Sequence, residues 1–321
     1  MDTLNIKRFI PRKIKQGIKD LMGSYSNSTM EFLLQKYHDL GICFIESRVD
    51  MRLIRLEVLE YYSHPENYEL LDEDGRTLLA KIRNEFGYGG RLRPDDLYYP
   101  PSKVEEYTPY SDCMVNGHIL TLPFDKEKAR TYMNGLWNEQ TDGHPHQYVC
   151  PDKDSIDVPE GAVLLDIGAA EGFFAMKYLE RCKKIYVFEC DYTWQECLKK
   201  SFAPFKDKVE IVSGFAGDAP GNISIDDFFK NREKPTFVKM DVEGAEGSIL
   251  RSMKNLLSNA EPLTLSICTY HRQEDWDRYY DMLKNNFDIS HSDSYFWHMP
   301  DAEPPFFRRG VMRAVKKKEL R

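Results

Sequence analysis

The chain has 321 residues, of which 41% are hydrophobic and 30% are charged, and its formal net charge is −8. This length is enough for one core of domain size and a smaller accessory domain. The acidic balance argues against a general nucleic-acid-binding protein, which would carry a basic surface. No run approaches the roughly 18 apolar residues that a transmembrane helix needs, and no secretory signal is visible, so a cytoplasmic protein is expected.

The seven cysteines are scattered along the chain and include no Cys-x-x-Cys pair. Several stand in apolar stretches, as the reduced thiols of cytoplasmic proteins do. Their spacing suggests neither a zinc site nor an iron–sulfur site. No metal is therefore expected.

Residues 1–110 are polar and are predicted to form a mainly helical accessory region, with helical spacing over 30–40 and 51–62. A further candidate helix covers residues 11–22 and carries lysines and arginines beside one apolar face. Two interpretations of it stay open: it docks on the protein, or it lies on an anionic membrane surface at the inner face of the membrane. A loop rich in Pro, Asp and Tyr over 91–110 marks the boundary with a second domain, 111–321.

The second domain begins with a predicted strand over 118–122 and a predicted helix over 125–137, with Asp125 as its N-cap. From Gly161 onward, short apolar runs alternate with helical segments. This alternation predicts an α/β fold with a doubly wound sheet. The expected strands are 163–167, 185–189, 209–213, 236–240 and 263–269, and the expected helices start near 172, 192, 224 and 245.

The C-terminal segment breaks this alternation. Strand-like runs over 295–298 and 310–315 flank a proline-rich stretch. They predict a closing antiparallel hairpin.

A glycine-rich turn follows the first strand of the alternating region. Gly168 and Gly172 in such a turn let a ligand approach the backbone closely. Asp166, just before the turn, favours a cationic or amino-bearing ligand over a pyrophosphate. S-adenosylmethionine fits, because it carries a sulfonium and an amino group and no phosphate. Glu189 ends the next strand, where a carboxylate can accept both hydroxyls of an adenosine ribose.

Two alternative interpretations of this turn are weaker. A tight strand–helix turn without a ligand accounts for the glycines alone, but not for Asp166 and Glu189 in this strand order. A nicotinamide enzyme would carry Gly-x-Gly-x-x-Gly, which the chain lacks here. Further cofactor contacts are expected from Ala169 in the turn, from Cys190 after Glu189, and from Gly214 and Phe215 after the third strand, where an adenine edge would be read. Tyr148 is a further expected contact.

Acidic residues follow the fourth strand, at the sheet edge where ligands bind in such folds. Asp241 is expected to act there, on the amino group of the methyl donor, on the acceptor or on a metal. Glu243 is expected to contact the acceptor, and it shares a helix face with Glu246. For Glu246 the plainer interpretation is strong, because the helix dipole favours acidic residues at an N-terminus.

The fifth strand delivers Tyr270, His271 and Arg272 to the same edge. His271 is the best candidate for a general base, because imidazole titrates near neutral pH. A strand-end histidine bonded only to backbone is the plainer interpretation. Arg272 is suited to a carboxylate or phosphate on the acceptor, and Tyr270 is expected to contact the acceptor as well.

Two histidines, His144 and His146, precede the glycine-rich region. Their spacing suggests a metal, but without a third ligand such pairs are more often exposed loops. A role in closing the cofactor pocket is favoured, with His146 at the acceptor and Tyr148 stacking or hydrogen-bonding there.

Four motifs together resemble the FkbM-type methyltransferases that use S-adenosylmethionine. They are Leu165-Asp-Ile-Gly-Ala-Ala-Glu-Gly172, Lys239-Met-Asp-Val-Glu-Gly-Ala-Glu246, Cys268-Thr-Tyr-His-Arg272 and Arg309-Gly-Val-Met-Arg313. The resemblance covers roughly residues 115–316. It implies a class I methyltransferase (Rossmann-like) fold and usually O-methylation of sugars, glycan building blocks or hydroxylated natural products. It also implies that Asp166, Gly168, Gly172 and Glu189 contact the cofactor.

The expected function is therefore methyl transfer from S-adenosylmethionine to a hydroxyl, of a sugar in a surface glycan or its precursor. Methylation of a small natural product or a lipid-linked intermediate is a second hypothesis. A cofactor-binding assembly partner without catalysis is a third. The oligomeric state is not readable from the sequence.

Overall fold

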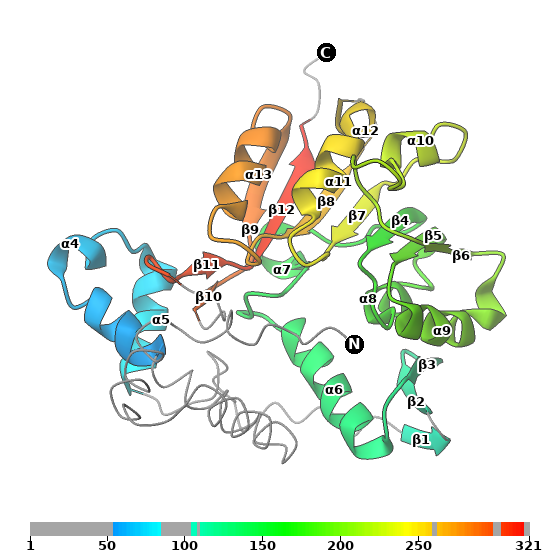
Figure 1. Cartoon of the computed structure of the whole chain (residues 1–321), viewed down its shortest axis with the longest axis horizontal. Helices are drawn as coiled ribbons and strands as arrows, with labels where there is room; N and C mark the ends of the chain where they lie inside the picture. Colours follow the sequence, from blue (N-terminus) through cyan, green and yellow to red (C-terminus); the bar gives the residue numbers. More distant parts are fainter. Residues whose placement is uncertain (1–53, 85–103, 108–109, 259–261, 298–302, 318–321) are drawn as a thin grey trace, which may run out of the picture. The chain divides into compact units, whose positions relative to one another are not determined.

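The structure, a computed structural model, describes residues 54–84, 104–107, 110–258, 262–297 and 303–317. The chain divides into two compact units, residues 1–92 with 296–307, and residues 93–295 with 308–321 (Figure 1). Among the described residues, no helix combines the length and the apolar character that a membrane span requires.

The first unit is helical where it is described. Residues 54–61 are helical, within the predicted 51–62. They are followed by α4 (Pro65–Tyr68) and α5 (Glu73–Asn84), and Leu78, Leu79 and Ile82 of α5 are buried. The helices predicted over 11–22 and 30–40 lie outside the described residues.

The second unit is built on a seven-stranded sheet with the order β6-β5-β4-β7-β8-β12-β9. Its first five strands in that order are parallel, and β12 runs antiparallel to both of its neighbours. The parallel strands and the helices between them match the predicted alternation closely. They are β4 (Ala162–Ile167), α8 (Phe173–Lys177), β5 (Cys182–Glu189), α9 (Tyr192–Ser201), η2 (Ala203–Phe205), β6 (Val209–Ser213), α10 (Ile225–Phe228), β7 (Phe237–Met240), α11 (Glu246–Ser252), α12 (Lys254–Ser258) and β8 (Thr264–Cys268).

Alternate side chains of β4 serve two hydrophobic cores, as the period of a strand requires. Leu164 faces the core that contains residues of α8 and α9, such as Phe174 and Leu198. Val163 and Leu165 face the core formed with α10, α11, α12 and α13 (Asp275–Leu283). Helices therefore cover both faces of the sheet, and the strand ends are left for ligands (Figure 1).

A separate three-stranded antiparallel sheet precedes this core. It contains β1 (Val104–Tyr107), β2 (Tyr110–Val115) and β3 (His118–Leu122), and α6 (Lys126–Glu139) and the short α7 (Pro151–Asp154) follow it. Asp125 caps α6 as predicted, because its Oδ1 accepts a hydrogen bond from the Lys128 amide at 2.9 Å. Strand β1 corrects the loop expected over 91–110, since pairing with β2 overrides a turn-rich composition.

The closing strands differ from the expected hairpin in their partners. β12 (Val311–Lys316) pairs with β8 and with β9 (Phe287–His291), whereas β10 (Tyr295–Phe296) pairs with the short β11 (Arg308–Arg309). The antiparallel closure is confirmed, but the two predicted runs do not pair with each other. The strand β9 was not expected, although Phe287-Asp-Ile-Ser290 alternates apolar and polar residues.

Candidate active site

The expected site residues gather at the carboxyl ends of β4, β5, β7 and β8. Strand order reverses between β4 and β7, and this switch point leaves a crevice in open α/β sheets. Three features meet there: the glycine-rich turn after β4, the carboxylate of Glu189 after β5 and a cluster of polar side chains around Asp241.

The turn after β4 is held against the end of β7. Gly168 has a φ of +73°, and a Cβ at this position would lie 1.8 Å from the backbone oxygen of Asp241. The amides of Gly168 and Ala169 both donate to the Phe188 oxygen, at 3.0 and 3.2 Å. Gly172 has a φ of +86°, and a Cβ there would lie 2.6 Å from the Leu198 side chain. Glycine is therefore required here for close backbone packing as well as for any ligand.

Glu189 also holds the turn. Its Oε2 accepts a hydrogen bond from the Ala170 amide at 2.8 Å, and its Oε1 accepts from Cys190 and Asp191 at 2.7 and 2.8 Å. The side chain is 7% exposed. A carboxylate oxygen accepts more than one hydrogen bond, so this arrangement is compatible with the expected contact to ribose.

Asp166 is fully buried and faces Lys239 of β7. The lysine Nζ lies 3.2 Å from Asp166 Oδ1 and donates to the Gly168 oxygen at 2.6 Å. Burial alone would lower the pKa of Lys239, but the charges of Asp166 and Asp241 outweigh it and raise that pKa. Sequence reasoning missed this pair. The available signal was a lysine in the middle of an otherwise apolar strand.

Asp241 is the centre of the polar cluster. On one side, its Oδ2 accepts from the Tyr148 hydroxyl at 2.7 Å and lies 3.1 Å from His146 Nε2. On the other side, its Oδ1 lies 3.4 Å from both the Tyr270 hydroxyl and His271 Nε2. Burial opposes ionisation of Asp241, but His146, Lys239 and His271 outweigh it and hold its pKa well below the usual value. The structure thus brings together five of the expected residues from three separate segments.

Each of the two histidines has a glutamate behind it. Glu139 Oε2 lies 3.0 Å from Nδ1 of His146, and Glu246 Oε1 lies 3.1 Å from Nδ1 of His271. A row of alternating carboxylates and imidazoles therefore runs through Asp241. Glu139 was not expected as a site residue, and for Glu246 the helix-dipole interpretation was favoured, because their places beside the histidines depend on tertiary packing.

The carboxylates change the basicity of both rings. Burial alone would lower the pKa of His271, but the hydrogen bond and charge of Glu246, with the charges of Asp241 and Glu243, raise it. For His146, burial is likewise outweighed, by Cys268, Asp241 and Glu139, and its pKa lies well above the usual value. Both imidazoles are therefore stronger bases than free histidine.

The loop that carries His146 is clamped by the C-terminal strands. A Cβ on Gly310 would lie 1.7 Å from the Pro145 oxygen, and Ser292 Oγ donates to the same oxygen at 2.6 Å. Arg313, which is 1% exposed, donates to the Gln147 oxygen at 2.8 Å. The motif around Gly310 and Arg313 thus has a positioning role, which the sequence alone did not reveal.

A second buried acid lies in the glycine-rich turn itself. Glu171 accepts a hydrogen bond from the Tyr132 hydroxyl of α6 at 2.8 Å. Burial raises the pKa of Glu171 to about 7, against the hydrogen bonds that favour its charged form. The helix α6 thus contributes to the site at two points, through Tyr132 and through Glu139.

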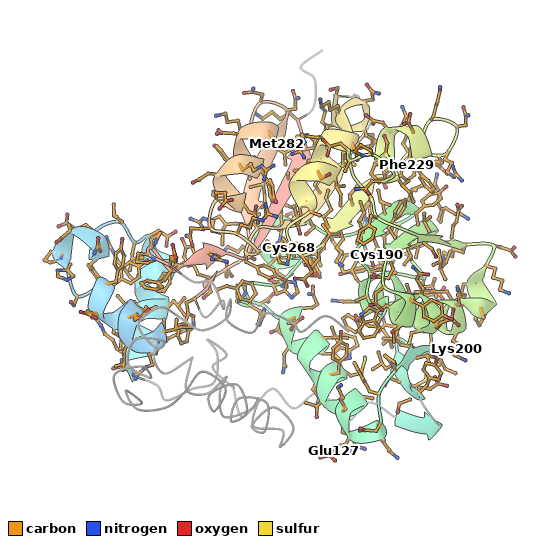
Figure 2. The ribbon with its side chains drawn as sticks, viewed as in Figure 1. Glu127, Cys190, Lys200, Phe229, Cys268 and Met282 are labelled. Atoms are coloured by element: carbon orange, nitrogen blue, oxygen red, sulfur yellow. The ribbon has the colours of Figure 1, made fainter. Side chains whose placement is uncertain are left out.

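The other expected residues lie at the rim. Cys190 is exposed beyond the end of β5 (Figure 2), and Phe215 is 67% exposed beyond the end of β6. Gly214 donates to the Glu189 oxygen at 3.2 Å. Glu243 is 92% exposed, with Oε2 3.6 Å from His271 Nε2, and Arg272 is exposed beside Gly244. Their contacts with cofactor or acceptor stay predictions.

Comparison with known proteins finds one family model that matches part of the second unit. Residues 207–293 match the family model described as the methyltransferase FkbM domain. This segment contains Asp241, His271 and both of their supporting strands. The match confirms that this segment resembles the FkbM-type methyltransferases. No curated protein matches the chain in sequence.

Solved structures of methyltransferases are similar at low identity. A methyltransferase FkbM from Methylobacillus flagellatus KT is 20% identical with a TM-score of 0.40, over 53% of this chain and 50% of that chain. The matched part thus spans half the length of the Methylobacillus protein. The fibrillarin of Aeropyrum pernix, in complex with S-adenosyl-L-methionine, is 13% identical with a TM-score of 0.37, over 66% of this chain and 98% of that chain.

Proposed function

We propose that this chain, with its FkbM methyltransferase domain and S-adenosylmethionine as cofactor, methylates a hydroxyl of a sugar in a surface glycan or its precursor. The observation that carries the proposal is the pair formed by His271 and Asp241. Nε2 of His271 lies 3.4 Å from Asp241 Oδ1, and the Glu246 carboxylate lies behind the ring. Removal of a hydroxyl proton needs such a base at the sheet edge where the donor turn lies.

The residues at the donor side fit the cofactor. The glycine-rich turn has no room for a Cβ at Gly168, and the carboxylate of Glu189 is fixed by three backbone amides. When bound, S-adenosylmethionine supplies the methyl group, and its carbon–sulfur bond breaks as the acceptor oxygen bonds to that carbon. Glu189 would accept the ribose hydroxyls, by the logic of dinucleotide sites.

His271 and Asp241 act on the acceptor in this proposal. Neutral His271 accepts the hydroxyl proton on Nε2 while the oxygen attacks. Asp241 then faces an imidazolium, which its charge stabilises, and it orients the acceptor through Oδ1 together with Tyr270. Positioning of the acceptor supplies much of the acceleration, because methyl transfer demands an in-line arrangement.

The donor half is tested by calorimetric titration with S-adenosylmethionine and, separately, with NAD. We expect tight S-adenosylmethionine binding in the wild type, weakened about 10-fold to 100-fold in Glu189→Ala, because a hydrogen bond to a charged group contributes about 1.5–3 kcal/mol. Binding of NAD in its place would refute the donor site.

The acceptor half is tested by formation of S-adenosylhomocysteine with a panel of sugars and glycan precursors. His271→Gln should lower turnover about 10²-fold to 10⁴-fold while S-adenosylmethionine still binds. A variant that keeps the wild-type rate would exclude His271 as the base. If only small natural products or lipid-linked acceptors are methylated, the second hypothesis replaces the sugar. If no acceptor stimulates turnover, the non-catalytic hypothesis holds.

The cellular place of the enzyme is part of the proposal. We place it in the cytoplasm, where residues 11–22 either dock on the protein or contact the inner face of the membrane. If deletion of residues 1–23 leaves co-sedimentation with vesicles unchanged, a membrane contact through residues 11–22 is refuted.

A further inference from the structure

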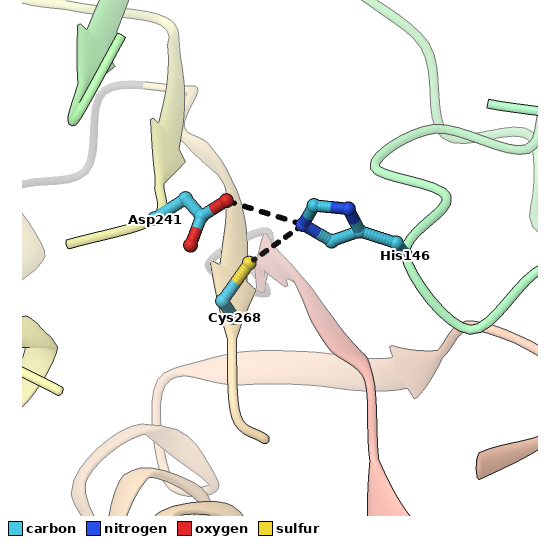
Figure 3. Close-up of side chains that lie close together, drawn as sticks. All are labelled: His146, Asp241 and Cys268. Carbon is cyan, nitrogen blue, oxygen red and sulfur yellow. Dashed lines mark hydrogen bonds and ion pairs between the residues drawn. The ribbon is translucent and has the colours of Figure 1, made fainter. Parts of the chain in front are cut away.

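The acceptor mechanism leaves one side of Asp241 without a chemical role. On this side His146 Nε2 lies 3.1 Å from Asp241 Oδ2 and 3.6 Å from Sγ of Cys268, the last residue of β8 (Figure 3). The three atoms all lie within 4.8 Å of one another. They come from the loop before α7 and from the ends of β7 and β8, so no short sequence motif contains them.

We propose that His146, Asp241 and Cys268 bind one divalent transition-metal ion, with Zn²⁺ or Co²⁺ as the fitting type. Bond lengths of about 2.0–2.3 Å to nitrogen, oxygen and sulfur place the ligands of a tetrahedral ion roughly 3.3–3.6 Å apart. The observed separations of 3.1 and 3.6 Å are close to this spacing. A mixed nitrogen, oxygen and sulfur set selects such ions over Mg²⁺, which prefers oxygen ligands in octahedral geometry.

The surroundings of His146 are those of a metal ligand. Its Nδ1 faces the Glu139 carboxylate at 3.0 Å, which turns Nε2 towards Asp241 and Cys268. An outer carboxylate of this kind fixes the ring and raises its basicity as a ligand. The hydroxyl of Tyr148 lies 2.9 Å from Nε2 and 2.7 Å from Asp241 Oδ2, so a bound ion would replace its hydrogen bonds to these two ligand atoms.

The charges at this place also favour a cation. Asp241 and Glu139 both face His146, whereas the nearby Lys239 is already paired with Asp166. A bound divalent ion would balance these carboxylates in place of protons. Binding converts the Cys268 thiol to a thiolate and needs a neutral His146 Nε2, so protons are released to solvent and no oxidant or reductant is involved.

The test uses the full chain after treatment with a chelator. Titration with CoCl₂ or ZnCl₂ should show one equivalent bound, and the cobalt form should show a thiolate-to-cobalt charge-transfer absorption. MgCl₂ should produce neither. Failure of the wild type to take up one equivalent of either ion would overturn the proposal.

Variants then locate the ion. Cys268→Ser should abolish the charge-transfer band, and His146→Gln should weaken uptake by more than the ~10-fold to 100-fold expected for the outer variant Glu139→Gln. Cys182→Ser changes another buried cysteine outside the cluster and should change neither readout. Uptake that persists unchanged in Cys268→Ser or in His146→Gln would place the ion elsewhere and refute this site.

Titration with S-adenosylmethionine on the same samples separates the two proposals. If the wild type binds S-adenosylmethionine but no metal, only the proposed metal site is refuted. If the wild type binds the metal but no S-adenosylmethionine, only the proposed donor site is refuted.

Discussion

Nδ1 of His271 lies 3.1 Å from Oε1 of Glu246, a carboxylate with no exposed surface at the start of α11. The same oxygen accepts a hydrogen bond from the Val242 amide at 3.0 Å, so the glutamate is itself fixed. A carboxylate behind an imidazole keeps the ring in one orientation and stabilises it when it gains a proton. Glu246 is therefore a positioning residue for the proposed base.

Glu246→Gln should lower kcat about 10-fold to 100-fold while the KM for S-adenosylmethionine stays nearly constant. The physical reason is the loss of the carboxylate charge beside the imidazole, and a 10-fold to 100-fold change corresponds to about 1.4–2.7 kcal/mol. Steady-state kinetics measures both constants. Ser252→Ala is the control, because Ser252 is also buried on α11 and its hydroxyl donates to the Ile249 oxygen at 2.8 Å, away from His271. Equal kinetic losses in both variants would mean that Glu246 has only a structural role.

Gly168→Ala should destabilise the protein by about 2–4 kcal/mol and abolish binding of S-adenosylmethionine. The left-handed backbone contributes about 1–2 kcal/mol of this, and the forced separation of the turn from Asp241 contributes the rest. Denaturant unfolding and calorimetry measure the two effects.

Gly161→Ala is the matched control for the turn. Gly161 has a φ of +72°, but a Cβ there has no neighbour within 4 Å. Gly161→Ala should therefore lose only the 1–2 kcal/mol, roughly, that the left-handed backbone contributes, and it should bind S-adenosylmethionine normally. If Gly168→Ala and Gly161→Ala lose the same stability and bind the cofactor equally, the close approach of the turn to Asp241 does not contribute to stability.

Glu171→Gln should stabilise the protein in a pH-dependent manner. Burial raises the pKa of Glu171 from 4.5 to about 7. Between these two values Glu171 is ionised in the unfolded chain but protonated in the folded protein. The contribution of Glu171 to the free energy of unfolding of the wild type is therefore present below pH 4.5 and is lost as the pH rises through 7. The variant cannot ionise and should gain up to about 3 kcal/mol relative to wild type.

Urea unfolding at several pH values between about 4.5 and 8 measures this gain. The exposed Glu274→Gln is the control substitution. A gain that does not grow with pH would contradict the account of Glu171.

Arg313→Met should destabilise the protein by about 3–5 kcal/mol, because it leaves Asp154 without its buried partner at 2.8 Å. It should also free the loop that holds His146. Denaturant unfolding measures the first effect, and amide hydrogen exchange at 144–148 measures the second. Arg251→Met removes an exposed pair with Asp218 and should have little effect on either. Unchanged exchange in Arg313→Met would show that the loop is held by other contacts.

The sequence allowed prediction of most of the described second unit. Apolar runs of strand length and helical segments alternate clearly, so β4 to β8 and the starts of α8, α9, α10 and α11 lie within a few residues of the expected positions. The turn after β4 was predictable because paired glycines between a buried strand and a helix are typical of a tight turn that a ligand approaches. The pairing of β12 was not predictable, because strand order depends on contacts between distant segments.

The sequence by itself thus determined the class of fold, the donor turn and the edge at which Asp241 and His271 meet. These follow from local patterns, since the carboxyl ends of parallel strands always share one edge. Only the tertiary structure decided which side chains surround Asp241. His146 lies 95 residues from Asp241 and 122 residues from Cys268 along the chain, and the chemistry of this cluster arises from distances and burial that no local pattern encodes.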